Sequence, residues 1–515
     1  MRKLAWGAGL VLLGLGCGDD EPEPEPTASA TDKLIEALGG QENLDALTGL
    51  RIAGTGSRLI PHEGLRPADP SIETNNFERE VLLDFAGDAV RVDTNRDIEF
   101  LFPGSQEYTD VVRGNLGASS QPFFGAPLGA LGSDKAASIR HQELLLAPQF
   151  LIREYDPEDF TQEDDVQLEG ETHHQLVATG GPAPLTLFVN AETGELSKLE
   201  TQELDFYLRD VKLEVTYSDW EPTASGGISF PRELHVARDG FDLFTEEVTE
   251  VEANPAFAAE TFEFPGGVTP AFDQELWDRG VLSHQWYYLL DSIGLPFNGV
   301  DVSINPTSIA DGVTHLVGAS HHSFLVEQAD GLVLVDAPLH DDRGKALFDY
   351  IETNFPGKPI KFIVASHFHE DHVSGIREVL GSTDATLVVH ESVENHWRDV
   401  LSAPSTLKPD ALEENPRDVT ILTVPNDGSI QLEDAGHPLT IYHLNTTHAA
   451  DMLLTHDTAS NSVFVVDIYS PGNASQLGAA DLDAALTNFE VPTADLKIVG
   501  GHGGVGDYAQ LQSSL

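Results

Sequence analysis

The sequence of 515 residues has almost no cysteine and few positive charges. Cys17 is the only cysteine, which excludes a disulfide within the chain and a zinc site built from several thiolates. Only 28 lysine and arginine residues stand against 85 aspartate and glutamate residues, a formal net charge of −57. A surface of this sign repels nucleic-acid phosphates and anionic lipid headgroups, so we expect neither as a partner.

Long apolar runs are missing beyond the N-terminus. Arg2 and Lys3 precede the apolar stretch 4–16, which is too short for a stable membrane anchor and is followed directly by Cys17. This order resembles a bacterial lipoprotein signal, in which the cysteine becomes the lipidated first residue. The resemblance implies an exported outer-membrane lipoprotein that faces the periplasm or the exterior and touches the membrane only through a lipid on Cys17. The alternative is an ordinary secretory signal with an incidental cysteine.

Composition divides the rest of the chain. After the signal segment 1–17, alternating Glu and Pro residues make 18–30 an acidic, extended tether. Residues 31–268 are expected to form a mostly β domain, 269–300 a connecting segment, and 301–515 an α/β domain in which apolar strands alternate with helices.

The β domain is expected to begin with a short helix over 31–47, broken at Gly39-Gly40. Period-2 alternation then predicts a curved antiparallel sheet of about eight to eleven strands. A helix followed by such a sheet resembles the half-barrels of lipoprotein carriers, which cradle acyl chains. His173 and His174 are adjacent within this region and are expected at the surface.

Titratable residues crowd into the stretch that follows the apolar run 360–364. His367, His369, Asp371 and His372 stand within six positions. On a turn that leaves a strand, both imidazoles of a His-x-His pair can project the same way. Imidazole and carboxylate ligands suit zinc, so the stretch predicts a metal site.

Further along the chain, three more residues can complete such a site. His448, Asp467 and His502 each follow an apolar strand, and His502 lies in a glycine-rich turn where the backbone can approach an ion. Ends of neighbouring strands meet at one edge of a sheet, so we expect these side chains to converge with the first four.

The series His367-x-His369-x-Asp371-His372, then His448, Asp467 and His502, resembles the ligand series of the metallo-β-lactamase-fold hydrolases over residues 303–510. The resemblance implies an α/β fold, an αββα sandwich with two Zn²⁺ ions between the sheet edges. It assigns one ion to His367, His369 and His448, the other to Asp371, His372 and His502, with Asp467 as a bridge. Asp336 at the end of an early strand would support the site from behind its ligands.

These residues favour hydrolysis in which metal-bound hydroxide attacks an ester, lactone, thioester or amide-type small molecule, with Asp371 also steering a proton. One alternative is an iron-containing redox member of the same fold. Another is a lipid-binding envelope lipoprotein whose hydrolase-like domain is not catalytic. Substrate and oligomeric state stay open.

The remaining polar residues near the motif are expected to be structural. Phe368 and Glu370 are interpreted as spacers, and isolated histidines of this domain are more often hydrogen-bonded scaffold than ligands. The histidines interpreted in this way are His321, His322, His390, His396, His443 and His456.

Overall fold

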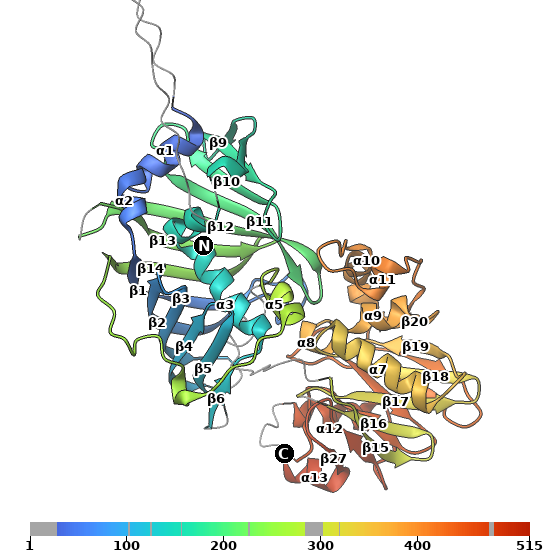
Figure 1. Cartoon of the computed structure of the whole chain (residues 1–515). Coiled ribbons are helices and arrows are strands. Elements are labelled where there is room, and N and C mark those ends of the chain that lie inside the picture. Colours follow the sequence, from blue (N-terminus) through green and yellow to red (C-terminus); the bar gives the residue numbers. More distant parts are fainter. Residues whose placement is uncertain are drawn as a thin grey trace, which may run out of the picture.

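A computed structural model describes residues 28–100, 103–123, 126–155, 157–224, 227–283, 302–318, 320–472 and 478–515. The signal segment with Cys17, most of the tether and most of the connecting segment lie outside the described residues. Among the residues that are described, no helix has both the length and the apolar composition needed to cross a bilayer. The described chain forms two domains that lie side by side (Figure 1).

The N-terminal domain is a single large sheet with a few helices. Its strands are β1 (Gly49–Ile60), β2 (Ile72–Asp84), β3 (Ala89–Ile98), β4 (Gly104–Arg113), β5 (Leu116–Phe123), β6 (Ala126–Ala130), β7 (Phe160–Gln162), β8 (Val166–Leu168), β9 (Glu171–Ala178), β10 (Leu185–Asn190), β11 (Leu196–Asp205), β12 (Arg209–Pro222), β13 (Ser229–Arg238) and β14 (Phe241–Ala253). Its helical elements are α1 (Ala30–Ala37), α2 (Gln41–Ala46), α3 (Ser133–Leu146), α4 (Pro148–Glu154), η1 (Pro157–Asp159), η2 (Pro265–Gly267) and α5 (Gln274–Gly280).

The sheet has 14 strands in the order β6-β5-β4-β3-β2-β1-β14-β13-β12-β11-β10-β9-β7, with β8 paired to β9. The mostly antiparallel β domain is thus confirmed, as is the helical start, which breaks at Gly39-Gly40 into α1 and α2. The predicted number of eight to eleven strands was too low; β6, β7 and β8 have only five, three and three residues, too few for period-2 alternation to be recognised.

One face of the sheet buries the helices. Ile52, Val81 and Val236 of the sheet share one apolar core with Leu34 of α1 and Ile139 of α3. Sequence periodicity missed α3 because this helix is buried on nearly all sides, including its polar residues, and therefore has no apolar stripe.

A buried ion network ties α3 to the sheet. Arg79 of β2 lies 2.7 Å from Glu143 of α3 and 2.7 Å from Glu246 of β14, and all three side chains are almost fully buried. Such a network tolerates the loss of no member, because each charge depends on the others for compensation.

His173 is another buried polar residue of this domain. Its Nε2 lies 2.8 Å from Ser197 Oγ, so its expected surface position was wrong.

The C-terminal domain contains two sheets. The first is formed by β15 (Asn305–Ala310), β16 (Val313–Val317), β17 (Ser323–Gln328), β18 (Gly331–Val335), β19 (Ile360–Val364), β20 (Thr386–His390) and β21 (Ile421–Val424), in that order. The second is formed by β22 (Ser429–Leu432), β23 (Leu439–His443), β24 (Leu453–Asp457), β25 (Ser462–Phe464), β26 (Lys497–Val499) and β27 (Val505–Asp507), again in order. The helices are α7 (Asp341–Asn354), α8 (Glu370–Val373), α9 (Ile376–Gly381), η3 (Glu391–Val393), α10 (Glu394–Ser402), α11 (Ala411–Glu414), α12 (Ala479–Asn488) and α13 (Tyr508–Ser513).

The two sheets share one core. Phe324 of β17 stacks on Phe464 of β25 with ring centroids 5.7 Å apart. Strands β18 to β21 run parallel, as do β25 and β26, so the residues that follow them emerge at common edges.

The domains are joined by the turn between β11 and β12, which reaches towards α10 and α11 (Figure 1). Arg209 in this turn is fully buried, and its guanidinium lies 2.8 Å from Asp341 and 3.3 Å from Asp410. It also donates to Ser405 Oγ at 2.9 Å. Asp210 accepts from the backbone N–H of Thr406 at 2.6 Å, so the 403–408 loop is held by the N-terminal domain.

Candidate metal centre

The motif histidines stand where β19 passes into α8. The chain leaves β19 after Val364, turns through residues 365–369, and begins α8 at Glu370. His367 and His369 project from the turn, while Asp371 and His372 lie in the first residues of the helix. The loop after β23, the segment after β25 and the turn after β26 bring His448, Asp467 and His502 to the same place.

Four of these residues form a first cluster, His367, His369, His448 and Asp467, whose ligand atoms all lie within 4.8 Å of one another. The Nε2 atoms of His367 and His448 are 3.3 Å apart. Asp467 Oδ2 lies 3.0 Å from His448 Nε2 and 3.4 Å from His367 Nε2.

A second cluster is formed by His321, Asp371, His372 and His502, whose ligand atoms also lie within 4.8 Å of one another. Asp467 joins it through its other oxygen, since Oδ1 lies 2.9 Å from His372 Nε2 and 2.9 Å from His502 Nε2. One carboxylate therefore faces both clusters, one oxygen to each. The structure brings together all seven residues that the sequence assigned to the metals.

The ligand atoms have the environment that a cation requires. His369 Nδ1 and Asp371 Oδ1 are buried, and neither has a hydrogen-bond partner in the described part of the chain. Buried polar atoms without partners are costly, and here they converge on common points. The nitrogen and carboxylate donors suit zinc or iron, so the residues fit a pair of such ions.

Hydrogen bonds to the opposite ring nitrogens orient three of the histidines. His502 Nδ1 donates to the carbonyl of Ser320 at 2.8 Å, which leaves Nε2 to face Asp467. His367 Nδ1 lies 3.1 Å from the hydroxyl of Ser366, which itself donates to Asp336 Oδ2 at 2.8 Å. Metal-binding histidines are commonly fixed in this way.

Asp336 lies at the end of β18, behind the ligands. It accepts from the backbone N–H of Ser366 at 2.8 Å and lies 3.6 Å from His372 Nδ1. It is fully buried and reaches His367 only through Ser366. This position supports both clusters without facing the points on which the ligand atoms converge.

Charge in the site is strongly coupled. Burial lowers the pKa of His367 and lowers that of His369 further, which keeps these imidazoles in the neutral form that binds metals. Burial opposes the ionisation of Asp467, but the imidazoles of His372 and His502 outweigh it and hold the pKa of Asp467 well below its usual range.

His321 was interpreted as scaffold, yet it belongs to the second cluster. Its Nε2 lies 2.8 Å from Asp371 Oδ2, and its ring lies 4.2 Å from that of His502. It comes from the turn before β17, which carries no metal-type spacing. The adjacent pair His321-His322 after a strand is the only signal the sequence offered.

Four other histidines expected to be scaffold have partners outside the two clusters. His390 and His443 stack with ring centroids 3.9 Å apart, His396 Nε2 lies 2.8 Å from Tyr207 Oη, and His456 Nε2 lies 3.1 Å from Asn461 Oδ1.

The N-terminal domain reaches the metal centre through the 61–71 segment, which connects β1 and β2. The carbonyl of Gly64 accepts from His369 Nε2 at 2.9 Å, and the carbonyl of Leu65 accepts from the backbone N–H of Ala450 at 2.8 Å. A Cβ at Gly64 would lie 2.9 Å from that of Asp69, which favours glycine in this turn. Nothing in the spacing of residues 61–71 predicts that this segment belongs to the site.

Glu370, interpreted as a spacer, is also an interface residue. It is buried and lies 3.8 Å from Arg238 of β13, which is paired with Asp205. Phe368 is fully buried, with its ring against those of His369 and His396. Both residues between the motif ligands therefore anchor the site, and Glu370 does so against the other domain.

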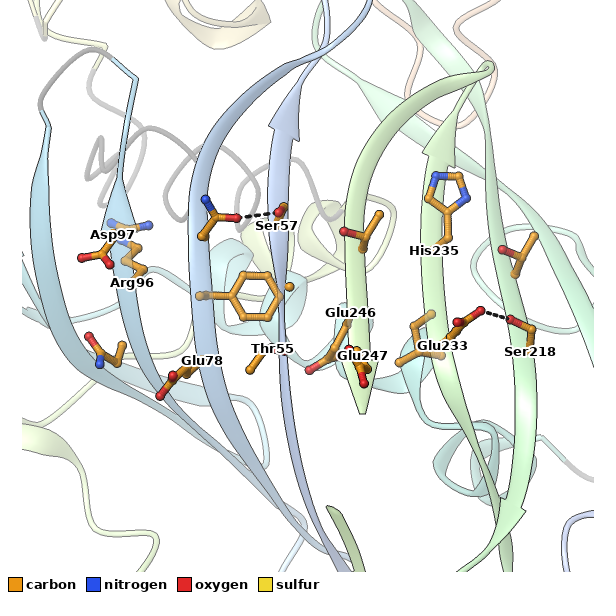
Figure 2. Close-up of a pocket in the computed structure, with 17 residues that line it drawn as sticks. Thr55, Ser57, Glu78, Arg96, Asp97, Ser218, Glu233, His235, Glu246 and Glu247 are labelled. Carbon is orange, nitrogen blue, oxygen red and sulfur yellow. Dashed lines mark hydrogen bonds between the residues drawn. The ribbon is translucent and has the colours of Figure 1, made fainter. Parts of the chain in front are cut away.

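A groove of about 810 Å³ lies far from these clusters, on the outer face of the N-terminal sheet (Figure 2). Its polar side chains are partly engaged with one another. Ser57 donates to Asn76 at 2.7 Å, and Ser218 donates to Glu233 at 3.0 Å. The groove contains neither of the two clusters that can hold a metal, so we assign the chemistry to the C-terminal domain.

Comparison with known proteins agrees with this assignment. Residues 316–471 match the family model of the metallo-beta-lactamase superfamily, while no curated protein matches the chain.

Solved structures similar to the chain include a metallo-beta-lactamase from Pontibacter korlensis (19% identity, 41% of this chain, 97% of that chain, TM-score 0.31). Another is the metallo-beta-lactamase FIM-1 from Pseudomonas aeruginosa in its mono-zinc form (17% identity, 42% of this chain, 94% of that chain, TM-score 0.32). A third is the flavodiiron protein from Giardia intestinalis (15% identity, 41% of this chain, 58% of that chain, TM-score 0.32). The family match and the layered sheets identify the C-terminal domain as one with the metallo-β-lactamase fold.

Proposed function

We propose that the C-terminal domain is a dinuclear metal-dependent hydrolase that acts on a small molecule with an ester, lactone, thioester or amide-type bond. The observation that carries the proposal is the position of Asp467, whose two oxygens face two separate clusters at 2.9 to 3.4 Å. A carboxylate placed in this way is suited to bridge two cations. Location at the cell envelope is part of the same proposal and is supported by the segment around Cys17.

Two bound ions would supply an acidified water and an electrophile that polarises the scissile group. The protein residues would hold these partners in place. Asp371 Oδ2 is engaged by His321, so Oδ1 is the atom available to accept a proton or to bind. The Gly64 and Leu65 carbonyls and the buried Phe368 limit the access of bulk water from the side of the N-terminal domain.

Metal removal tests the proposal. The purified full chain is expected to contain two metal ions by elemental analysis and to hydrolyse at least one substrate class in a chromogenic panel. A chelator should abolish this activity and added Zn²⁺ should restore it. His367→Ala and Asp467→Asn should each lower activity by at least about 100-fold, because loss of even a supporting residue costs about 10- to 100-fold.

His235→Ala is the matched control, since this histidine lies on the outer face of the N-terminal sheet and pairs with Asp242. Full hydrolytic activity in metal-free protein would contradict the proposal. Iron instead of zinc, together with oxygen consumption and no hydrolysis, would favour the redox alternative.

The lipid-binding alternative rests on the resemblance of the N-terminal half to lipoprotein carriers. The cavity between α3 and the sheet, beside Arg58, Gln142 and Leu146, measures about 10 Å³. That space holds one water molecule at most and no acyl chain.

A further inference from the structure

Glu63 stands at the metal centre although it belongs to the other domain. It lies in the 61–71 segment, and its Oε2 is 3.5 Å from His369 Nδ1. Its side chain is only 10% exposed. No hydrogen bond joins its carboxylate to a described residue.

The atom that Glu63 faces is the one that would hold a metal. A carbonyl oxygen only accepts hydrogen bonds, so the contact of His369 Nε2 with the Gly64 carbonyl places the proton on Nε2. Nδ1 therefore carries the lone pair. It is buried and has no hydrogen-bond partner in the described part of the chain.

The separation of Glu63 from His369 matches the separations within the clusters. Neighbouring ligand atoms of the two clusters lie from 2.8 Å (His321 to Asp371) to 3.8 Å (His372 to Asp371) apart. Two donors about 2.1 Å from a tetrahedral ion are about 3.4 Å apart. The 3.5 Å contact between Glu63 Oε2 and His369 Nδ1 lies within the first range and close to the second value.

Charge points the same way. The carboxylates that act on Glu63 are those of Asp371, Glu370 and Asp467. A buried carboxylate without a hydrogen bond and beside other carboxylates is costly unless a cation lies among them.

We propose that Glu63 is a further metal-binding residue, whose carboxylate adds an oxygen ligand to the divalent ion held by the first cluster. The inference rests on the dinuclear centre proposed above. It gives that ion ligands from both domains, so the N-terminal domain takes part in holding the metal and does not merely adjoin the site.

Metal titration of the full chain tests this proposal. Metal-free wild type, Glu63→Gln and the control Glu78→Gln, which makes the same charge change on the outer face of β2, are titrated with Zn²⁺ against a chromophoric chelator. Wild type and the control should bind two ions alike. E63Q should hold one of the two at least about 10-fold more weakly and keep the other unchanged.

Cobalt(II) provides a second readout, because its visible absorption reports the number and type of ligands. The cobalt-loaded spectrum of E63Q should differ from that of wild type, whereas the Glu78→Gln spectrum should not. Glu63→Ala, with its fold checked by circular dichroism, serves as a second variant and should show the same loss of affinity.

The two proposals fail in different ways. Two ions bound by both Glu63 variants with wild-type affinity and wild-type cobalt spectra would overturn the role of Glu63 and leave the dinuclear centre standing. Fewer than two ions bound by the wild type would overturn both.

Discussion

At the scale of single residues, the site depends on which atom of each side chain is already engaged. His369 and His502 each donate one ring N–H to a backbone carbonyl, and His367 contacts the Ser366 hydroxyl through Nδ1. The second nitrogen of each ring thereby keeps its lone pair for a metal. Residue type alone does not specify this; the hydrogen-bond partner selects the tautomer.

Asp110 in β4 gives a residue-scale prediction that is independent of the metal centre. Burial raises the pKa of its carboxyl to about 7, although Ser119, Arg96 and Arg58 partly offset the effect. In the unfolded chain the group ionises near its usual value of 3.8. The folded state therefore holds a proton that the unfolded state releases, and stability falls as pH rises from about 4 to about 7.

Asp110→Asn removes this dependence. Above pH 7 it should raise the free energy of unfolding by on the order of 4 kcal/mol, whereas at pH 4 it should change little. Urea unfolding of wild type and variant at several pH values measures the difference. Asp97→Asn, which removes an exposed carboxylate from the neighbouring strand, is the control; equal slopes for Asp110→Asn and wild type would contradict the prediction.

At the scale of elements, the metal motif could be predicted because its ligands follow strands that read clearly as apolar runs. Strands β18, β19 and β20 are parallel, so the residues that follow them lie at the same edge of the sheet. A ligand-type residue directly after each such strand is therefore expected to lie close to the others. Glu63 and Gly64 could not be predicted in this way. They lie in a turn of a different domain, and Gly64 is 305 positions from His369.

Helix α3 was not predicted from the sequence for a different reason. Its sequence contains Ser133, Asp134 and Lys135, which read as a solvated start but are buried against other elements of the domain. Periodicity detects a helix with one solvent-exposed face and one buried face, and α3 has no fully exposed face. Burial on all sides depends on tertiary packing, which local spacing does not encode.

The turn between β11 and β12 carries a prediction about the domain interface. Arg209→Ala removes the cation that Asp341 and Asp410 share. Asp410 keeps Arg377 at 2.6 Å, but the pair of Arg209 with Asp341 is lost, and breaking a buried pair of this kind costs about 3–5 kcal/mol. We expect an earlier urea transition and faster proteolysis between the domains. Lys212→Ala, on an exposed neighbour that pairs with Glu214, should leave both unchanged. An unaltered transition in the Arg209 variant would show that this contact does not hold the domains together.

At the scale of the whole molecule, the excess of acidic residues acts on every state of the chain. A net charge of −57 disfavours compact states through self-repulsion, and dissolved salt weakens that repulsion. The same charge draws divalent cations towards the surface, including the metal centre. Folding and metal loading are therefore both sensitive to ionic strength, in opposite directions.

Salt should stabilise the chain. Raising ionic strength from about 0.01 M to about 0.15 M shortens the Debye length from about 30 Å to about 8 Å. Each gain of about 1 kcal/mol should raise Tm by about 2–4 °C. Calorimetry of the metal-loaded chain measures the shift. NaCl and KCl should act alike because screening depends on ionic strength; a Tm that stays constant or falls would contradict the prediction.

The contact of the 61–71 segment with His369 has a consequence for how such a protein changes over generations. With the proposed role of Glu63, substitutions near it would alter metal occupancy while every residue of the histidine motif stays the same. The two domains should then evolve together, because replacing either one would separate His369 from the Gly64 carbonyl that orients it. Recombination between relatives should therefore preserve the pairing of this turn with its own C-terminal domain.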